Sequence, residues 1–126
     1  VIASGDNTSV LQIKRMIDET GCDGVAIARG ALGNPWIFRE LKRFFKEGIF
    51  YETPNIDERI DVMKIHLQQS IQYWGEKRGV ASFHKFFIWY TRGFRGIKPF
   101  RDIVFRISRA DELFNTIESL KFAYLA

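Results

Sequence analysis

The chain has 126 residues, of which 46% are hydrophobic and 27% charged, and its formal net charge at pH 7 is +4. Such a length accommodates one modest domain, or a smaller domain together with a piece of another. The most strongly apolar run, residues 86–90, is far shorter than the ~20 residues of a membrane-spanning helix, and a single cysteine, Cys22, excludes an internal disulfide. We therefore expect a globular protein without a membrane segment, in a reducing, cytoplasmic compartment.

Two short apolar segments, residues 1–3 and Gly24–Ala28, predict β-strands with a helix between them. The strands of such a βαβ unit should be parallel. Two strands do not make a stable parallel sheet by themselves, so we expect the missing strands upstream or in another chain. The first residue is Val1 rather than methionine, which favours a piece of a longer protein.

Two helices accompany these strands. The first is predicted from the capping residues 7–9 to Gly21, because glycine, which has no Cβ, is the usual residue directly after a helix end. The second is predicted to begin at Asn34, as the N-cap, with Pro35 in the first turn, and to end at Gly48. The residues expected on its buried face are Ile37, Leu41, Phe44 and Phe45.

From residue 54 onward the apolar residues recur at helical spacing throughout. Gly75 and Gly79 bracket the first interhelical turn, and the other connections are also short. The predicted helices are 57–74, 80–91, one that starts at Lys98-Pro99, and a last one capped by Ser108 and Asp111. Four helices with short loops predict a small four-helix bundle. With residues 48–55 as a linker, we expect two domains, 1–48 and 54–126.

Positive charge is concentrated in the helical half. Residues 1–53 carry equal numbers of basic and acidic side chains, whereas residues 54–126 carry twelve basic and eight acidic ones. Residues 77–109 contain nine basic side chains and a single acidic one, Asp102. Such a stretch can bind a phosphate backbone, although a solvated face on a basic protein explains the charge equally well.

Small residues and charges follow both predicted strands. In a parallel α/β fold, ligands bind at the carboxyl ends of strands, where glycines let backbone N–H groups approach an anion. An arginine adds a planar cation suited to phosphate. The residues at these two ends are Ser4, Gly5 and Asp6, and Ala28, Arg29 and Gly30. These residues predict a phosphate-binding site. The alternative is that the glycines only allow the chain to turn.

The residues themselves favour the first interpretation. The segment "SGD", followed by "GCDGVAIARGALGNPWIF", closely resembles the tRNA-dihydrouridine synthase family. The later segment "HKFFIWYTRGFRG" resembles that family's basic, aromatic helix, with Lys85, Trp89 and Tyr90 matching and His84 and Phe86 departing from it. The resemblance covers essentially the whole chain. It implies an α+β fragment that is mostly α: the end of an FMN-binding (β/α)8 TIM barrel followed by a helical tRNA-binding domain.

The resemblance also implies roles for individual residues. Members of the family reduce the C5–C6 bond of a uridine in tRNA with FMN, which NADPH recharges. The residues implied at the FMN phosphate are Ser4, Gly5, Asp6, Ala28, Arg29 and Gly30. Ser4 stands where the family has asparagine, and Ala28 where it has glycine, which is tolerable only if that position needs no positive φ. The residues that we expect to contact tRNA phosphates are Lys85, Arg92, Arg95, Lys98 and Arg101.

The family's catalytic cysteine, which lies in the earlier part of the barrel, has no counterpart here. Cys22 falls between a helix end and a strand start, away from the expected site, so we predict a small packing residue. Neither His66 nor His84 belongs to a pattern with metal-ligand spacing, and no metal is expected. Two alternatives stay open: a stand-alone RNA-binding helical module, and another FMN-dependent TIM-barrel oxidoreductase.

Overall fold

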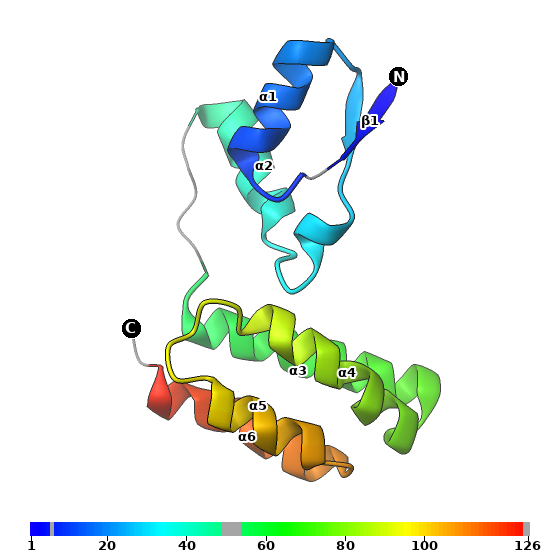
Figure 1. Cartoon of the computed structure of the whole chain (residues 1–126), viewed down its shortest axis with the longest axis vertical. Coiled ribbons are helices and arrows are strands. Elements are labelled where there is room, and N and C mark those ends of the chain that lie inside the picture. The colour runs from blue at the N-terminus through cyan, green and yellow to red at the C-terminus, as the bar shows by residue number, and fades with distance from the viewer. Residues whose placement is uncertain (6, 49–53, 125–126) are drawn as a thin grey trace. The chain divides into compact units, whose positions relative to one another are not determined.

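A computed structural model describes residues 1–5, 7–48 and 54–124. The chain divides into two compact units, Val1–Thr53 and Pro54–Ala126, and each is described by itself (Figure 1). The first unit contains a small parallel sheet and two helices, and the second is entirely helical. The described part of the chain is therefore mostly α.

The two strands of the first unit are parallel, as predicted. β1 (Ile2–Ser4) pairs with β2 (Gly24–Ala26) in a register that places Ser4 opposite Ala26. The helix between them, α1 (Val10–Thr20), brings the chain back to the starting edge, which is what makes a parallel pair possible. Ser9 caps α1 by accepting a hydrogen bond from the Gln12 N–H.

The connection from β2 to the next helix is longer than predicted. β2 ends at Ala26 rather than Ala28, and a 3₁₀ turn, η1 (Arg29–Ala31), follows. Gly33 then adopts a φ of +66°, and α2 begins at Ile37 and ends at Glu47. The prediction that Asn34 caps this helix was wrong: the Ile37 N–H bonds to the Asn34 carbonyl in a separate turn, and Trp36 occupies the N-cap position.

The core of the first unit is small and one of its faces is open. Its buried apolar side chains are Val10, Ile13, Trp36 and Ile37. Phe45, predicted to point inward, is 53% exposed. It lines a shallow, mostly apolar groove of about 320 Å³ between α1, the sheet and α2, with Ile13, Ile17, Val25, Ile27, Leu41 and Lys42. An apolar groove of this kind can accept further side chains from a neighbouring layer.

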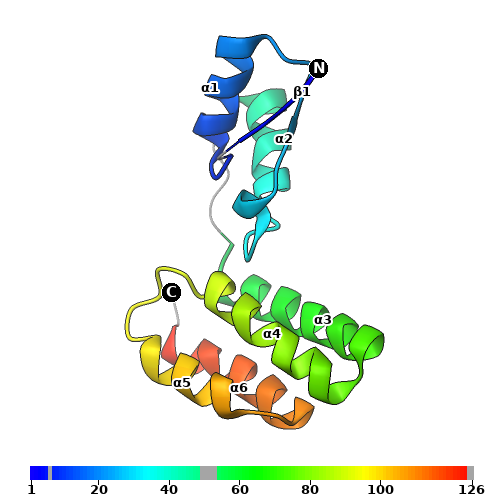
Figure 2. The same ribbon diagram turned by 45° about the vertical axis from the view of Figure 1, so that its right-hand side comes forward.

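The second unit consists of four helices, α3 (Ile56–Trp74), α4 (Glu76–Tyr90), α5 (Lys98–Arg106) and α6 (Ala110–Ala123). α3 and α4 run antiparallel side by side, with α5 and α6 packed along them (Figures 1 and 2). The fully buried side chains form one apolar core between these helices: Met63, Leu67, Val80, Phe83, Phe87, Val104, Leu113, Ile117 and Leu120.

The corner between α3 and α4 is tighter than predicted. A single residue, Gly75, separates the two helices, and Gly79 lies inside α4 rather than in a turn. A Cβ atom on Gly79 would lie 2.7 Å from the Cα of Ile71, so only glycine allows this close approach. The Ser70 hydroxyl also donates a hydrogen bond to the Gly79 carbonyl, at 3.0 Å. Backbone proximity, which periodicity does not reveal, explains Gly79.

The start of α6 also differs from the prediction. Ser108 and Asp111 do not form a capping box; Arg109 is the N-cap residue, and its side chain makes no capping bond. The carboxylate of Glu76, at the start of α4, instead accepts a hydrogen bond from the Ala110 N–H at 2.9 Å. This contact joins residues 34 positions apart and holds the first turns of α4 and α6 at the same end of the unit.

Candidate functional site

The loops that follow the two strands are linked through Asn7. Its side chain is 2% exposed, and its amide nitrogen donates a hydrogen bond of 3.0 Å to the carbonyl of Ala26, the last residue of β2. Its backbone N–H bonds to the Gly5 carbonyl at 2.8 Å. The amide oxygen of Asn7 is buried and has no hydrogen-bond partner among the described residues. Sequence reasoning treated Asn7 only as a helix cap; its position directly after a strand was the signal that could have indicated this role.

Gly30 brings the second loop into contact with the first. A Cβ atom at Gly30 would lie 2.0 Å from the Asn7 carbonyl oxygen and 3.0 Å from the Cα of Thr8. Gly30 is therefore needed for a close backbone approach rather than for a positive φ. The structure thus places the two predicted strand-end segments next to each other, around Asn7.

The other residues predicted for this site surround the same contact. Ser4 ends β1 and is exposed, and Gly5 follows it, with the Met16 methyl group 3.0 Å from where a Cβ would lie. Ala28 has a φ of −115°, so this position does not need glycine for a positive φ. Arg29 is exposed as the first residue of η1. Asp6, also predicted for this site, lies outside the described residues.

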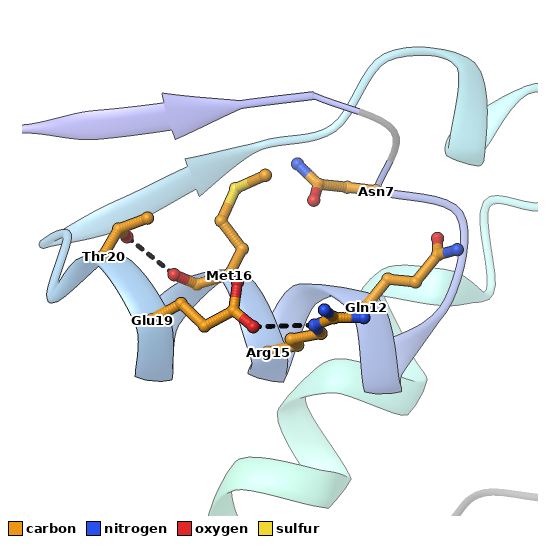
Figure 3. A pocket seen from close by; sticks show the side chains of 6 residues that line it. All are labelled: Asn7, Gln12, Arg15, Met16, Glu19 and Thr20. Atoms are coloured by element: carbon orange, nitrogen blue, oxygen red, sulfur yellow. Dashed lines mark hydrogen bonds and ion pairs between the residues drawn. The ribbon is translucent and has the colours of Figure 1, made fainter.

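A pocket of about 290 Å³ lies beside this contact, along α1 (Figure 3). Two of its polar side chains form an ion pair: the Arg15 guanidinium bonds to Glu19 at 2.8 Å, and this hydrogen bond raises the pKa of Arg15. The Thr20 hydroxyl donates to the Met16 carbonyl at 2.6 Å. The charges of Arg15 and Glu19 in this pocket are therefore already paired with each other.

The basic residues of the stretch 77–109 are spread along α4. This helix is about 22 Å long. Four of the predicted RNA contacts lie at or beyond its C-terminal end, and Lys85 lies between the two ends. The residues near the C-terminal end are Arg92, Arg95, Lys98 and Arg101; those near the N-terminal end are Lys77, Arg78 and Arg109. Arg106 lies toward the middle of α4, because the carbonyl of the next residue, Ile107, is 3.0 Å from the His84 Nε2.

Arg101 differs from the other predicted RNA contacts. Lys85, Arg92, Arg95 and Lys98 are exposed, whereas Arg101 is half-buried. Its Nη2 donates hydrogen bonds to the carbonyls of Ile88, at 3.3 Å, and Thr91, at 3.2 Å. These carbonyls belong to the last turn of α4, where a cation is also favoured by the helix dipole. The structure gives Arg101 a role in holding α5 against the end of α4.

Most aromatic residues of α4 belong to the core. Phe83, Phe87 and Tyr90 are buried, while Phe86 and Trp89 are half-buried, with ring centroids 5.2 Å apart. The Lys85 ammonium lies 5.4 Å from the centre of the Phe86 ring. Phe86 and Trp89 are thus the rings of this helix that retain exposure beside a basic side chain.

Both histidines make structural contacts. The His66 Nδ1 lies 2.9 Å from the Tyr90 hydroxyl, and its ring packs against the rings of Phe83 and Phe86. Burial lowers the pKa of His66 below its usual value and raises the pKa of Tyr90. The His84 Nε2 lies 3.0 Å from the Ile107 carbonyl. Across the described ranges, no group of three or more His, Cys, Asp or Glu side chains could hold a metal ion.

The fold and the site define the class of the molecule: a parallel α/β unit with glycine-bearing strand ends, joined to a basic helical unit. The chain belongs to the dihydrouridine synthase family, whose model, described as "Dihydrouridine synthase (Dus)", matches residues 1–124. This confirms the resemblance drawn from the sequence. In the part of the chain that the structure describes, no helix is long and apolar enough to cross a membrane.

Curated relatives agree with this assignment. A "Probable tRNA-dihydrouridine synthase 1" of Synechocystis is 37% identical over 112 residues, which cover 89% of this chain and 31% of that protein. A "Probable tRNA-dihydrouridine synthase" of Rickettsia bellii is 34% identical over 104 residues, 82% of this chain and 32% of that protein. The "tRNA-dihydrouridine synthase B" of Pasteurella multocida is 34% identical over 101 residues, 80% and 30% respectively. The chain spans about a third of the length of these relatives.

Proposed function

We propose that this chain acts as part of a tRNA-dihydrouridine synthase, an FMN- and NADPH-dependent oxidoreductase that reduces the C5–C6 bond of a uridine in tRNA. The family match over residues 1–124 carries this proposal. The names of the relatives support tRNA as the substrate. The proposed setting is the cytoplasm, where tRNA is modified.

The first unit supplies the phosphate end of an FMN site, at the carboxyl ends of β1 and β2. The contact between Gly30 and the Asn7 carbonyl supports this, because it brings two small-residue loops together with an exposed arginine beside them. The donor set fits a phosphate: backbone N–H groups of small residues and a guanidinium. The residues that would hold the phosphate are Ser4, Gly5, Asp6, Ala28, Arg29 and Gly30. FMN supplies the hydride transfer; these residues bind and orient its phosphate.

The remainder of the barrel comes from an upstream portion of the same protein. The open apolar groove along α1, β2 and α2 supports this, as do the exposed side chains of Val1 and Ile2. The buried amide oxygen of Asn7 is a further indication, since a buried acceptor without a donor is costly and a neighbouring barrel segment could supply one. The finer fold is therefore the last two strands of a (β/α)8 TIM barrel, residues 1–48, followed by a helical bundle, residues 54–126.

The helical unit binds tRNA through the basic residues around the C-terminal half of α4. Lys85, Arg92, Arg95 and Lys98 are exposed and contact phosphates, and partly exposed Phe86 and Trp89 lie near Lys85. Arg101 also belongs to the proposed set, although its Nη2 is used within the unit. Electrostatic contacts of this kind bind RNA without reading its sequence.

No catalytic residue is proposed within this chain. Cys22 is half-buried in the connection between α1 and β2, near the N-terminal end of β2. The loops of the proposed site follow the C-terminal ends of the strands, so Cys22 is a packing residue rather than the acid that protonates the uracil ring. That acid, a cysteine, belongs to the upstream barrel portion.

Two measurements test these assignments separately. In the protein with its upstream barrel portion, Arg29→Ala should reduce the amount of FMN retained after gel filtration, with Lys46→Ala, which alters an exposed basic residue of α2 outside the groove, as the control. Equal flavin retention in both variants would contradict the phosphate site. Binding of the chain to a tRNA transcript, measured by gel shift, tests the helical unit. Absence of binding at low salt would contradict its role.

The alternatives are distinguished by the same experiments. A stand-alone RNA-binding module would bind tRNA but no flavin. Another FMN-dependent TIM-barrel oxidoreductase would bind flavin but not tRNA. It would not explain the exposed basic residues of α4 and the following loop.

A further inference from the structure

The corner between α3 and α4 exposes two adjacent aromatic side chains. Tyr73 is 77% exposed and Trp74 is 43% exposed, and their ring centroids lie 4.5 Å apart in an edge-to-face arrangement. The guanidinium carbon of Arg78, one turn into α4, lies 3.9 Å from the centre of the Trp74 ring. An indole and a guanidinium are thus already stacked at the surface. We call Tyr73, Trp74 and Arg78 the α3–α4 corner.

This corner is held in place by the backbone beneath it. Gly79 packs directly on the Ile71 backbone, and the Ser70 hydroxyl bonds to the Gly79 carbonyl. Gly75 is the single residue between α3 and α4. Because the backbone of both helices is fixed this close to the turn, Trp74 and Arg78 meet at a lower ordering cost than they would on a flexible loop.

The surface of the corner carries two exposed cations of its own, Lys77 and Arg78. Of the acidic residues nearby, Glu76 accepts a hydrogen bond from the Ala110 N–H, and Asp111 forms an ion pair with Arg109 at 2.8 Å. The corner therefore presents an ammonium and a guanidinium directly beside its exposed rings, which suits the phosphates of a nucleic acid.

We propose that the α3–α4 corner is a stacking platform for unpaired bases of the bound RNA. Unpaired bases stack on aromatic rings and on guanidinium planes, and the basic residues nearby would hold the adjoining phosphates. An apolar protein partner fits less well, because the exposed rings are edged by cations. This inference rests on the proposed tRNA binding by the helical unit and adds a second contact to it. Arg78 and Tyr90, the last residue of α4, lie about 18 Å apart along the helix, so the two contacts reach different parts of one RNA.

The test measures the affinity of the full chain for a fluorescently labelled tRNA transcript, by anisotropy, over a range of salt concentrations. Trp74→Ala and Tyr73→Ala should each weaken binding roughly 5-fold or more, while the dependence on salt stays unchanged, because no charge is lost. Arg78→Lys should also weaken binding at an unchanged salt dependence, since it keeps the charge and loses the plane. Phe38→Ala removes a ring of comparable exposure (48%) from α2 and should have no effect.

A blunt RNA duplex of similar length is the second probe. The platform predicts that Trp74→Ala weakens binding to tRNA and not to the duplex, because paired bases are not available for stacking. Unchanged tRNA affinity in Trp74→Ala, or an equal loss on both RNAs, would overturn the platform and leave the corner as a contact for another protein. Failure of the unaltered chain to bind tRNA would overturn the proposed function of the helical unit itself, and the platform with it.

Discussion

Gly30 lies so close to Asn7 that a Cβ atom on Gly30 would be 2.0 Å from the Asn7 carbonyl oxygen. The Asn7 side chain in turn bonds to the carbonyl of Ala26, at the end of β2. The loops after both strands are therefore joined twice, by a backbone approach and by a side-chain hydrogen bond. This junction brings Gly30, the neighbour of Arg29, against Asn7, three residues after the end of β1.

Replacement of Gly30 should disrupt this junction. Gly30→Ala forces a methyl group onto the Asn7 carbonyl and should lower the free energy of unfolding by about 1–3 kcal/mol, the usual cost of overpacking. Urea unfolding followed by circular dichroism measures it. Gly24→Ala is the matched control, because a Cβ there would meet only Ile2 Cγ1 at 3.8 Å. Equal stability of the two variants would show that the loops do not pack as described.

Replacement of Asn7 should lower the free energy of unfolding by as much as replacement of Gly30, in this case through the loss of a hydrogen bond. Asn7→Ala leaves the Ala26 carbonyl without its donor and should cost about 1–3 kcal/mol. It should also reduce FMN retention in the protein with its barrel portion, because the two loops are no longer tied. Asn115→Ala, which alters an exposed asparagine on α6, should change neither quantity. Full flavin retention in Asn7→Ala would separate Asn7 from the site.

Replacement of Arg101 should lower the stability of the helical unit, whereas replacement of Arg95 should change only tRNA binding. Arg101→Ala removes hydrogen bonds to the Ile88 and Thr91 carbonyls and should destabilise the helical unit by about 1 kcal/mol or more. Arg95→Ala should leave stability unchanged and reduce the slope of log affinity against log salt for tRNA by about one. Thermal unfolding and salt-dependent anisotropy measure the two effects. A destabilised Arg95→Ala, or an unchanged salt slope for it, would contradict this division.

The parts of the structure that depend on local sequence were predictable, and those that depend on distant contacts were not. Apolar periodicity located α3 to within a residue, and the βαβ pattern predicted parallel strands correctly. Glu76, in contrast, caps a helix 34 residues away, and Gly79 is explained by the Ile71 backbone, neither of which a local pattern contains. For the same reason the sequence could propose Arg101 for RNA but could not show its bonds to α4. The roles of the strand-end and RNA-contact residues remain predictions.

His66 should make the helical unit sensitive to mild acid. Burial lowers its pKa below 6.5, so just below pH 6.5 the unfolded chain binds more protons than the folded one. The stabilisation from neutral His66 is thus fully present above pH 6.5 and is lost as the pH falls toward the folded-state pKa. The side chains that face it are Tyr90, Phe83 and Phe86. Protonation would place a cation among these rings.

Urea midpoints at pH 7.5 and pH 5 measure this effect. The midpoint should fall with pH in the unaltered chain and fall less in His66→Gln. Glu118 contributes little to the comparison, because its usual pKa of 4.5 and its folded-state pKa of about 2, which hydrogen bonds from Lys121 and Lys64 lower, both lie below pH 5. An identical decline in the His66→Gln variant would assign the pH dependence to other groups.

We propose that this chain works within an enzyme that forms dihydrouridine in tRNA. The most direct measurement is mass spectrometry of nucleosides from an unmodified tRNA transcript, incubated with FMN, NADPH and the protein that includes the upstream barrel portion. We expect that a uridine gains two hydrogens, and that a variant with Arg92, Arg95 and Lys98 all changed to alanine forms less product at limiting tRNA. A flavin-loaded protein that binds tRNA and leaves every uridine unreduced would contradict the claim.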